Sequence, residues 1–64
     1  MGARMLRYLQ YAKEKGGDFA LTRLMLKTGV SEKTAEGKPD TPEELEKLHS
    51  TLSELLKDPS VPRF

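Results

Sequence analysis

Few side chains in this 64-residue sequence have the types and spacing that chemistry requires. His49 is the single histidine and there is no cysteine, so neither a second imidazole nor a thiolate can join it in a metal site or beside a general base. The acidic cluster at residues 43–46 matches neither a calcium-binding loop nor a catalytic pair of carboxylates, and it suits the start of a helix. Gly16 and Gly17 follow a helical pattern, whereas a phosphate-binding loop follows a strand. The sequence therefore predicts a protein that is not an enzyme and that holds no metal ion and no cofactor.

The elements that position these side chains belong to one small domain. A chain of this length buries only about 60% of the surface that it exposes when unfolded, so its core is thin and self-association would add to it. No apolar run approaches the roughly 20 residues that cross a bilayer, and the first six residues lack the apolar stretch of a signal peptide. We therefore expect a soluble, cytoplasmic protein with no membrane partner and no small-molecule substrate.

Charge is distributed unevenly along the chain, although the net charge is only +1. Residues 1–33 carry seven basic and three acidic side chains, a net +4, whereas residues 34–64 carry four basic and seven acidic side chains, a net −3. Two interpretations follow. Either the two halves fold onto each other and partly neutralise, or the basic half meets an acidic partner.

Two helices are predicted in the first part of the chain. Residues 3–15 place apolar side chains at i, i+3, i+4 and i+7, which is one face of an amphipathic helix: Met5, Tyr8, Leu9 and Ala12. Gly16 and Gly17 end this helix, because glycine adopts the left-handed conformation that closes a helix without steric cost. Asp18 suits the N-cap of a second helix at residues 19–28. Since this second helix is apolar around most of its circumference, we expect it to lie at the centre of the core.

A short helical turn and a long helix follow. Ser31 can cap a turn at residues 32–36. Thr41 fits an N-cap, a proline fits the first helical position and Glu44 fits the third, which together form a capping box. The helix that begins there is predicted over residues 42–57.

The chain is predicted to be all-α. No stretch shows the sustained alternation of a strand. Pro59 prevents the last helix from continuing. We predict a compact bundle of three main helices plus one short helical turn, in a single helical domain at residues 1–58, with a flexible C-terminal tail at residues 59–64.

The predicted core draws on all three main helices. Its members are the apolar residues on the inward stripes and the valine after the second helix: Met5, Leu9, Ala12, Phe19, Leu21, Leu24, Met25, Val30, Leu45, Leu48, Leu52 and Leu55.

The leucines of the last helix follow one another at alternating steps of four and three, the spacing of a heptad seam. This seam either packs against the first two helices of its own chain or meets a second chain. In the second case the protein is a helical interaction or regulatory module, whose partner is another protein or a second copy in a homodimer. The candidate protein interface comprises the seam and an edge of the first helix: Leu6, Tyr8, Tyr11, Leu48, His49, Leu52, Leu55 and Leu56.

The turn after the second helix reads Thr28-Gly29-Val30-Ser31. It resembles the helix-turn-helix of the repressor-like (Xre-type) DNA-binding family, with glycine in the tight turn, valine buried beneath it and serine capping the recognition helix. The resemblance covers about residues 24–39, and its candidate recognition helix is about one turn shorter than that of the family. It implies a DNA-binding, regulator-like protein as the alternative function. The candidate DNA contacts are Glu32, Lys33 and Thr34 in the major groove, and Arg23, Lys27 and Lys38 near phosphates.

Overall fold

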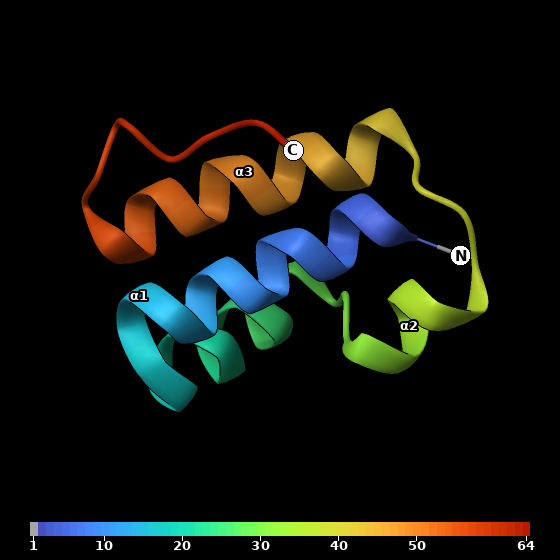
Figure 1. The fold of residues 1–64 in the computed structure, drawn as a ribbon, viewed down its shortest axis with the longest axis horizontal. Helices are drawn as coiled ribbons and strands as arrows, with labels where there is room; N and C mark the ends of the chain where they lie inside the picture. Colours follow the sequence, from blue (N-terminus) through green and yellow to red (C-terminus); the bar gives the residue numbers. More distant parts are fainter. Residues whose placement is uncertain (1) are drawn as a thin grey trace.

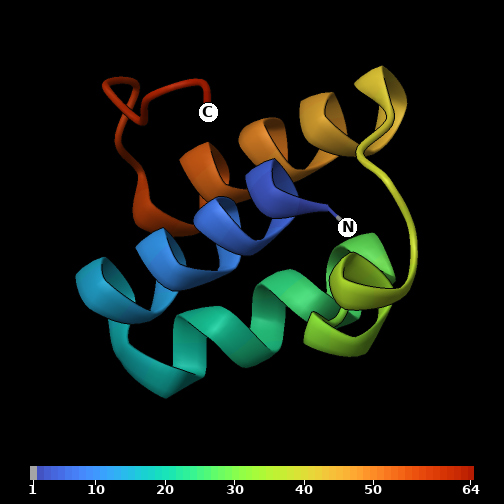
Figure 2. The ribbon, with the colours of Figure 1, turned by 45° about the vertical axis from the view of Figure 1, so that its right-hand side comes forward.

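A computed structural model describes residues 2–64, and it is all-α over that range. Three helices follow one another along the chain (Figure 1): α1 (Ala3–Thr28), α2 (Glu32–Gly37) and α3 (Pro42–Leu56). The N-terminal half of α1 and α3 lie side by side, and α2 packs at one end against α1 (Figures 1 and 2). The predicted all-α, compact bundle is therefore confirmed.

α1 consists of two helices that meet at Gly17. The backbone of Gly17 has φ 73° and ψ −170°, which is outside the helical region and is essentially reserved for glycine. The chain reverses there, so that residues 3–16 and residues 18–28 run back along each other (Figure 2). The predicted boundary between the first two helices is confirmed, and counting these two halves with α3 accounts for the three main helices of the prediction.

The N-terminal half of α1 is the central element of the bundle. In Figure 2 it lies between α3 and the C-terminal half of α1, residues 18–28. The sequence analysis expects residues 19–28 at the centre, and this expectation is wrong. Leu24 and Thr28 face the rest of the bundle, but Phe19 and Leu26 stand on the opposite side of the same helix with 75% and 74% of their surface exposed. Apolar residues around a helix therefore do not show that every side of it is covered.

The short helix and the long helix begin at the predicted residues. Ser31 accepts a hydrogen bond from the backbone N–H of Thr34, and Thr41 accepts one from that of Glu44, so each caps the start of its helix. The Thr41 hydroxyl also bonds the Glu44 carboxylate at 2.8 Å. α3 ends after Leu56, one residue before the predicted end, at a left-handed Lys57.

The core contains most of the predicted residues and several others. Its buried members are Met5, Tyr8, Leu9, Ala12, Leu24, Val30, Ala35, Leu48, Leu52 and Val61. Four predicted members, Leu21, Met25, Leu45 and Leu55, are half-buried and pack against this cluster. Phe19 is a wrong prediction because it points to solvent, and the buried positions of Tyr8, Ala35 and Val61 were not predicted as core.

Residues 59–64 turn back after α3 and return along it (red in Figure 1). Val61 is buried, and its carbonyl oxygen lies 2.9 Å from Nε2 of His49. The backbone N–H of Phe64 donates to the Tyr8 hydroxyl at 3.2 Å. The segment for which the sequence predicts flexibility therefore has a packed position, and its mobility stays a prediction for measurement.

Candidate functional site

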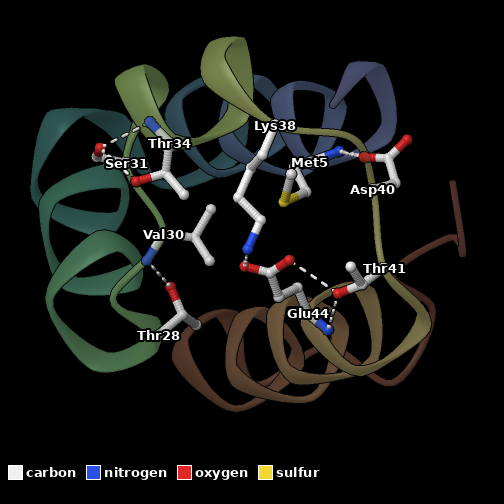
Figure 3. Close-up of polar contacts among 9 residues, drawn as sticks. All are labelled: Met5, Thr28, Val30, Ser31, Thr34, Lys38, Asp40, Thr41 and Glu44. Atoms are coloured by element: carbon white, nitrogen blue, oxygen red, sulfur yellow. Dashed lines mark hydrogen bonds and ion pairs between the residues drawn. The ribbon is translucent and has the colours of Figure 1, made fainter. Parts of the chain in front are cut away.

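The turn between α1 and α2 brings together a left-handed glycine, a buried valine and a serine that caps α2 (Figure 3). Gly29 is left-handed with φ 74°, and its N–H bonds the carbonyl of Met25. The Thr28 hydroxyl donates to the carbonyl of Leu24 at 2.7 Å and accepts from the N–H of Val30 at 3.2 Å. Val30 points into the core and is 2% exposed. A single threonine side chain thus closes the turn and orients the valine beneath it.

The helix that follows this turn offers little to a nucleic acid. α2 has six residues, so it is only about 9 Å long. Its exposed side chains are Glu32, Lys33 and Glu36, one base and two acids. Thr34 is half-buried, and its hydroxyl lies 3.1 Å from that of Ser31, within hydrogen-bond distance. The face that would enter the major groove therefore carries a net charge of −1.

The other candidate DNA contacts lie on different elements. Arg23 and Lys27 are exposed on the C-terminal half of α1. Lys38 reaches from the loop before α3 to the Glu44 carboxylate, with 2.9 Å between Nζ and Oε2 (Figure 3). Its hydrogen bond to Glu44, together with that from Thr41, lowers the pKa of Glu44 below the ordinary value of 4.5. Lys38 is therefore already paired, whereas Arg23 and Lys27 have no ion pair among residues 2–64.

Asp40 is a cap that sequence reasoning missed. Its carboxylate accepts the backbone N–H of Arg4 at 3.3 Å and that of Met5 at 3.0 Å (the latter drawn in Figure 3), so it caps the N-terminus of α1 from a loop far along the chain. A carboxylate also stabilises the positive end of the helix dipole. Asp40 shows no local pattern of capping, because its partners come from the opposite end of the sequence.

The leucine seam is internal for its central members. Leu48 and Leu52 are fully buried against α1, and Tyr8 is 1% exposed. These three side chains are enclosed by their own chain and present no surface to a partner. The structure thus assigns them to the core rather than to the candidate interface.

The remaining candidate interface residues lie on α1 and α3 and keep part of their surface exposed. Leu6, Tyr11, His49, Leu55 and Leu56 are each half-buried.

The C-terminal segment packs against the two tyrosines of the candidate interface. The Phe64 ring stands 5.1 Å from the Tyr8 ring and 5.8 Å from the Tyr11 ring, measured between centroids. The guanidinium of Arg7 lies 5.2 Å from the Phe64 centroid. The tyrosine edge of the candidate interface is therefore occupied by the chain itself.

An ion pair fastens the same segment to α3. The two terminal guanidinium nitrogens of Arg63 donate to the two carboxylate oxygens of Glu46. This contact lowers the pKa of Glu46 below its ordinary value and raises the pKa of Arg63. Both side chains are exposed, so water screens the pair and its contribution to stability is small.

Within residues 2–64, the two large apolar side chains that stay exposed, Phe19 and Leu26, both lie on the outer side of residues 18–28. Phe19 and Leu26 are seven residues apart, which is close to two helical turns, so they stand on one line about 10 Å apart. Arg23 lies between them in sequence, with its guanidinium 5.7 Å from the centroid of the Phe19 ring. We call this surface, made of Phe19, Arg23, Leu26 and Lys27, the outer face. Sequence reasoning missed it because it placed this helix, which is apolar around most of its circumference, at the centre of the core and counted Phe19 as a core residue.

Other kinds of site find little support in the described part of the chain. Within residues 2–64, no group of three or more histidine, aspartate or glutamate side chains is placed to hold a metal ion. Over the same residues, no helix combines the length and the apolar character that crossing a membrane requires.

Comparison of the chain with protein-family models, with curated proteins and with solved structures returned no match. The case for a function therefore rests on the geometry of this chain.

Proposed function

We propose that this protein is a small helical interaction module that acts by binding another protein and not by catalysis. The observation that carries the proposal is the outer face. Isolated exposed apolar residues are common on protein surfaces, but a large aromatic and a leucine aligned on one helix and three-quarters exposed are typical of a contact surface.

The position of the outer face supports this proposal. The helix of residues 18–28 lies on the other side of the N-terminal half of α1 from α3 (Figure 2), and Phe19 and Leu26 are about three-quarters exposed in the described chain. The helix that carries the outer face is held to the domain by its opposite side, where Leu24 is fully buried. A rigid helix with one buried and one free side can receive a partner helix without rearrangement.

A selection experiment tests the proposal. A library of displayed helical peptides is selected on the immobilised protein, and the enriched peptides are then measured against Phe19→Ser/Leu26→Ser. We expect peptides that bind the parent and lose binding to this variant. Glu43→Ser/Lys47→Ser changes two exposed residues of α3 and serves as the matched control. Enriched peptides that bind the parent and the Phe19→Ser/Leu26→Ser variant equally would contradict the proposal.

DNA binding remains the second candidate function, favoured by the closed Thr28–Val30 turn described above. Titration of the isotope-labelled protein with short duplex DNA tests it. Amide shifts at residues 28–35, with an affinity that falls steeply as salt rises, would establish this function. A spectrum that does not move at low salt would eliminate it.

A further inference from the structure

We infer that the partner of the outer face is an acidic amphipathic helix of another protein. This inference rests on the proposed function and specifies the chemistry of the partner. It comes from the charges around the two apolar side chains and from the small size of the surface.

The basic side chains form one edge of the outer face. Arg23 and Lys27 are four residues apart, so they are neighbours on the helix surface, on the same side of the line from Phe19 to Leu26. Neither has an ion pair among residues 2–64. The only acid of this helix, Asp18, is at its start, with its carboxylate 3.9 Å from Lys13. The free charge at the outer face is therefore positive.

Arg23 also lies beside the aromatic ring of the outer face. Its guanidinium rests near the Phe19 ring, an arrangement that favours cation–π attraction and limits the motion of a long side chain. A ring and a guanidinium side by side match a partner that presents an apolar residue next to a carboxylate. Arginine pairs with carboxylates through two parallel hydrogen bonds, which adds geometric selectivity.

The same charges disfavour a second copy of this chain as the occupant. In an antiparallel pair of outer faces related by a two-fold axis, each edge meets its own equivalent, so Arg23 and Lys27 would face the same two cations. A parallel pair could offer Arg23 only Asp18, which already has Lys13 beside it. Contact between the outer face and α3 of a second copy is disfavoured as well. The exposed acids of α3 have no large apolar side chain beside them that is as exposed as Phe19 or Leu26.

The small extent of the outer face also favours a single docked helix over a second copy of this chain. A stable dimer buries roughly 800 Å² per copy, about a fifth of the 4171 Å² that this chain exposes. Two apolar side chains along about 10 Å of helix are the anchors of a single docked helix. The partner should carry two apolar residues about two turns apart, with glutamate or aspartate on the side that meets Arg23 and Lys27.

Two designed peptides test the inference on the full chain. Both are amphipathic helices with leucines at i, i+3 and i+7, flanked by glutamates in one and by lysines in the other. Fluorescence anisotropy should show that the acidic peptide binds at least roughly tenfold more tightly, with an affinity that falls as salt rises. Arg23→Glu/Lys27→Glu should reverse this preference. Lys33→Glu/Lys47→Glu makes the same charge change elsewhere and should preserve it.

The variants distinguish failure of the inference from failure of the proposed function. If both peptides bind the parent equally and only Phe19→Ser/Leu26→Ser abolishes binding, the outer face is a docking site and its preference for acids is disproved. If Phe19→Ser/Leu26→Ser keeps full affinity for the acidic peptide, the proposed function fails as well. Circular dichroism of each variant shows that the fold is retained, as we expect for exposed positions.

Two other occupants are outcomes of the same series. A parent that sediments as a dimer, with a monomeric Phe19→Ser/Leu26→Ser variant, would make a second copy the partner and overturn the inference. Binding to anionic phospholipid vesicles without binding to the acidic peptide would overturn it in favour of a membrane surface.

Discussion

The two halves of α1 carry large apolar side chains at similar spacing, and their surroundings differ completely. Residues 3–16 lie between α3 and the other half of the helix, where Met5 and Ala12 lose all contact with water. Residues 18–28 bury Leu24 on one side and leave Phe19 and Leu26 in water on the other. The difference teaches that covering a helix depends on how many neighbours reach it. In this bundle the N-terminal half of α1 has a helix on two sides, whereas residues 18–28 are covered on one side only (Figure 2).

The largest expected loss of stability comes from truncating a leucine that is buried in the bundle. Leu52→Ala should lower the free energy of unfolding by about 2–5 kcal/mol, since the side chain is fully buried, and Leu24→Ala should cost a similar amount. Leu26→Ala should stay within about 0.5 kcal/mol of the parent, because its side chain is already in water. Urea unfolding followed by circular dichroism measures all three. A large loss for Leu26→Ala would mean that the outer face is covered.

The second largest effect on stability should come from Gly17, where the chain reverses direction between the two halves of α1. Gly17→Ala places a side chain where φ is 73° and ψ is −170°, and it should cost about 1–3 kcal/mol. Gly37→Ala is the matched control, because Gly37 has no positive φ and no atom near the position of a new Cβ. Thermal melts of the two variants and the parent compare these effects. Equal melting temperatures for Gly17→Ala and the parent would show that the reversal does not depend on glycine.

A smaller loss of stability, confined to residues 3–16 of α1, should follow from removing the carboxylate of Asp40. Asp40→Ala removes the carboxylate that caps the N–H groups of Arg4 and Met5, which should cost about 1 kcal/mol. Asp40→Asn keeps an acceptor and should cost much less. Hydrogen exchange should show faster exchange at residues 4–6 in Asp40→Ala while residues 18–28 remain as in the parent. Uniform acceleration along both halves would show that the cap supports the whole fold instead.

The smallest effect is a dependence on pH. The folded protein lowers the pKa of Glu44 and Glu46, so each carboxylate contributes stability above its ordinary value of 4.5, and this contribution is lost as the pH falls through the lowered pKa. The Arg63–Glu46 pair is exposed and the Lys38–Glu44 pair has one exposed partner, so water screens both and the loss should be slight. Melting temperatures between pH 7 and pH 3 should therefore fall less in Glu46→Gln than in the parent. Glu43→Gln, which changes an exposed acid with no ion pair among residues 2–64, should follow the parent.

The helices and their boundaries could be predicted because their signals are local. Ser31 and Thr41 cap helices that start at the next residue, and Gly17 breaks a helix at its own position. The seam of Leu48 and Leu52 was also identified, but its neighbours were left open between one chain and two. Capping and periodicity are properties of a single segment. The residues that pack against that segment belong to other parts of the chain or to another chain, so these local signals do not identify them.

The candidate site was predicted less well, for the same physical reason. Tyr8 was assigned to an interface because it lies at the edge of its helix, yet His49 and Phe64 close around it. Phe19 was assigned to the core because it is a large apolar residue beside other apolar residues. Neither assignment could be corrected without knowing which segments approach each helix.

By itself, the sequence determined the all-α class, the places where helices begin and end, and which side of α3 is apolar. These follow from hydrogen-bond capping, glycine conformation and the 3.6-residue period, all of which act over a few residues. Only the tertiary structure decided that residues 3–16 are central, that Asp40 caps α1, that residues 59–64 pack on the bundle and that Phe19 and Leu26 remain uncovered. These depend on contacts between segments far apart in the chain, and burial is a property of such contacts rather than of any residue alone.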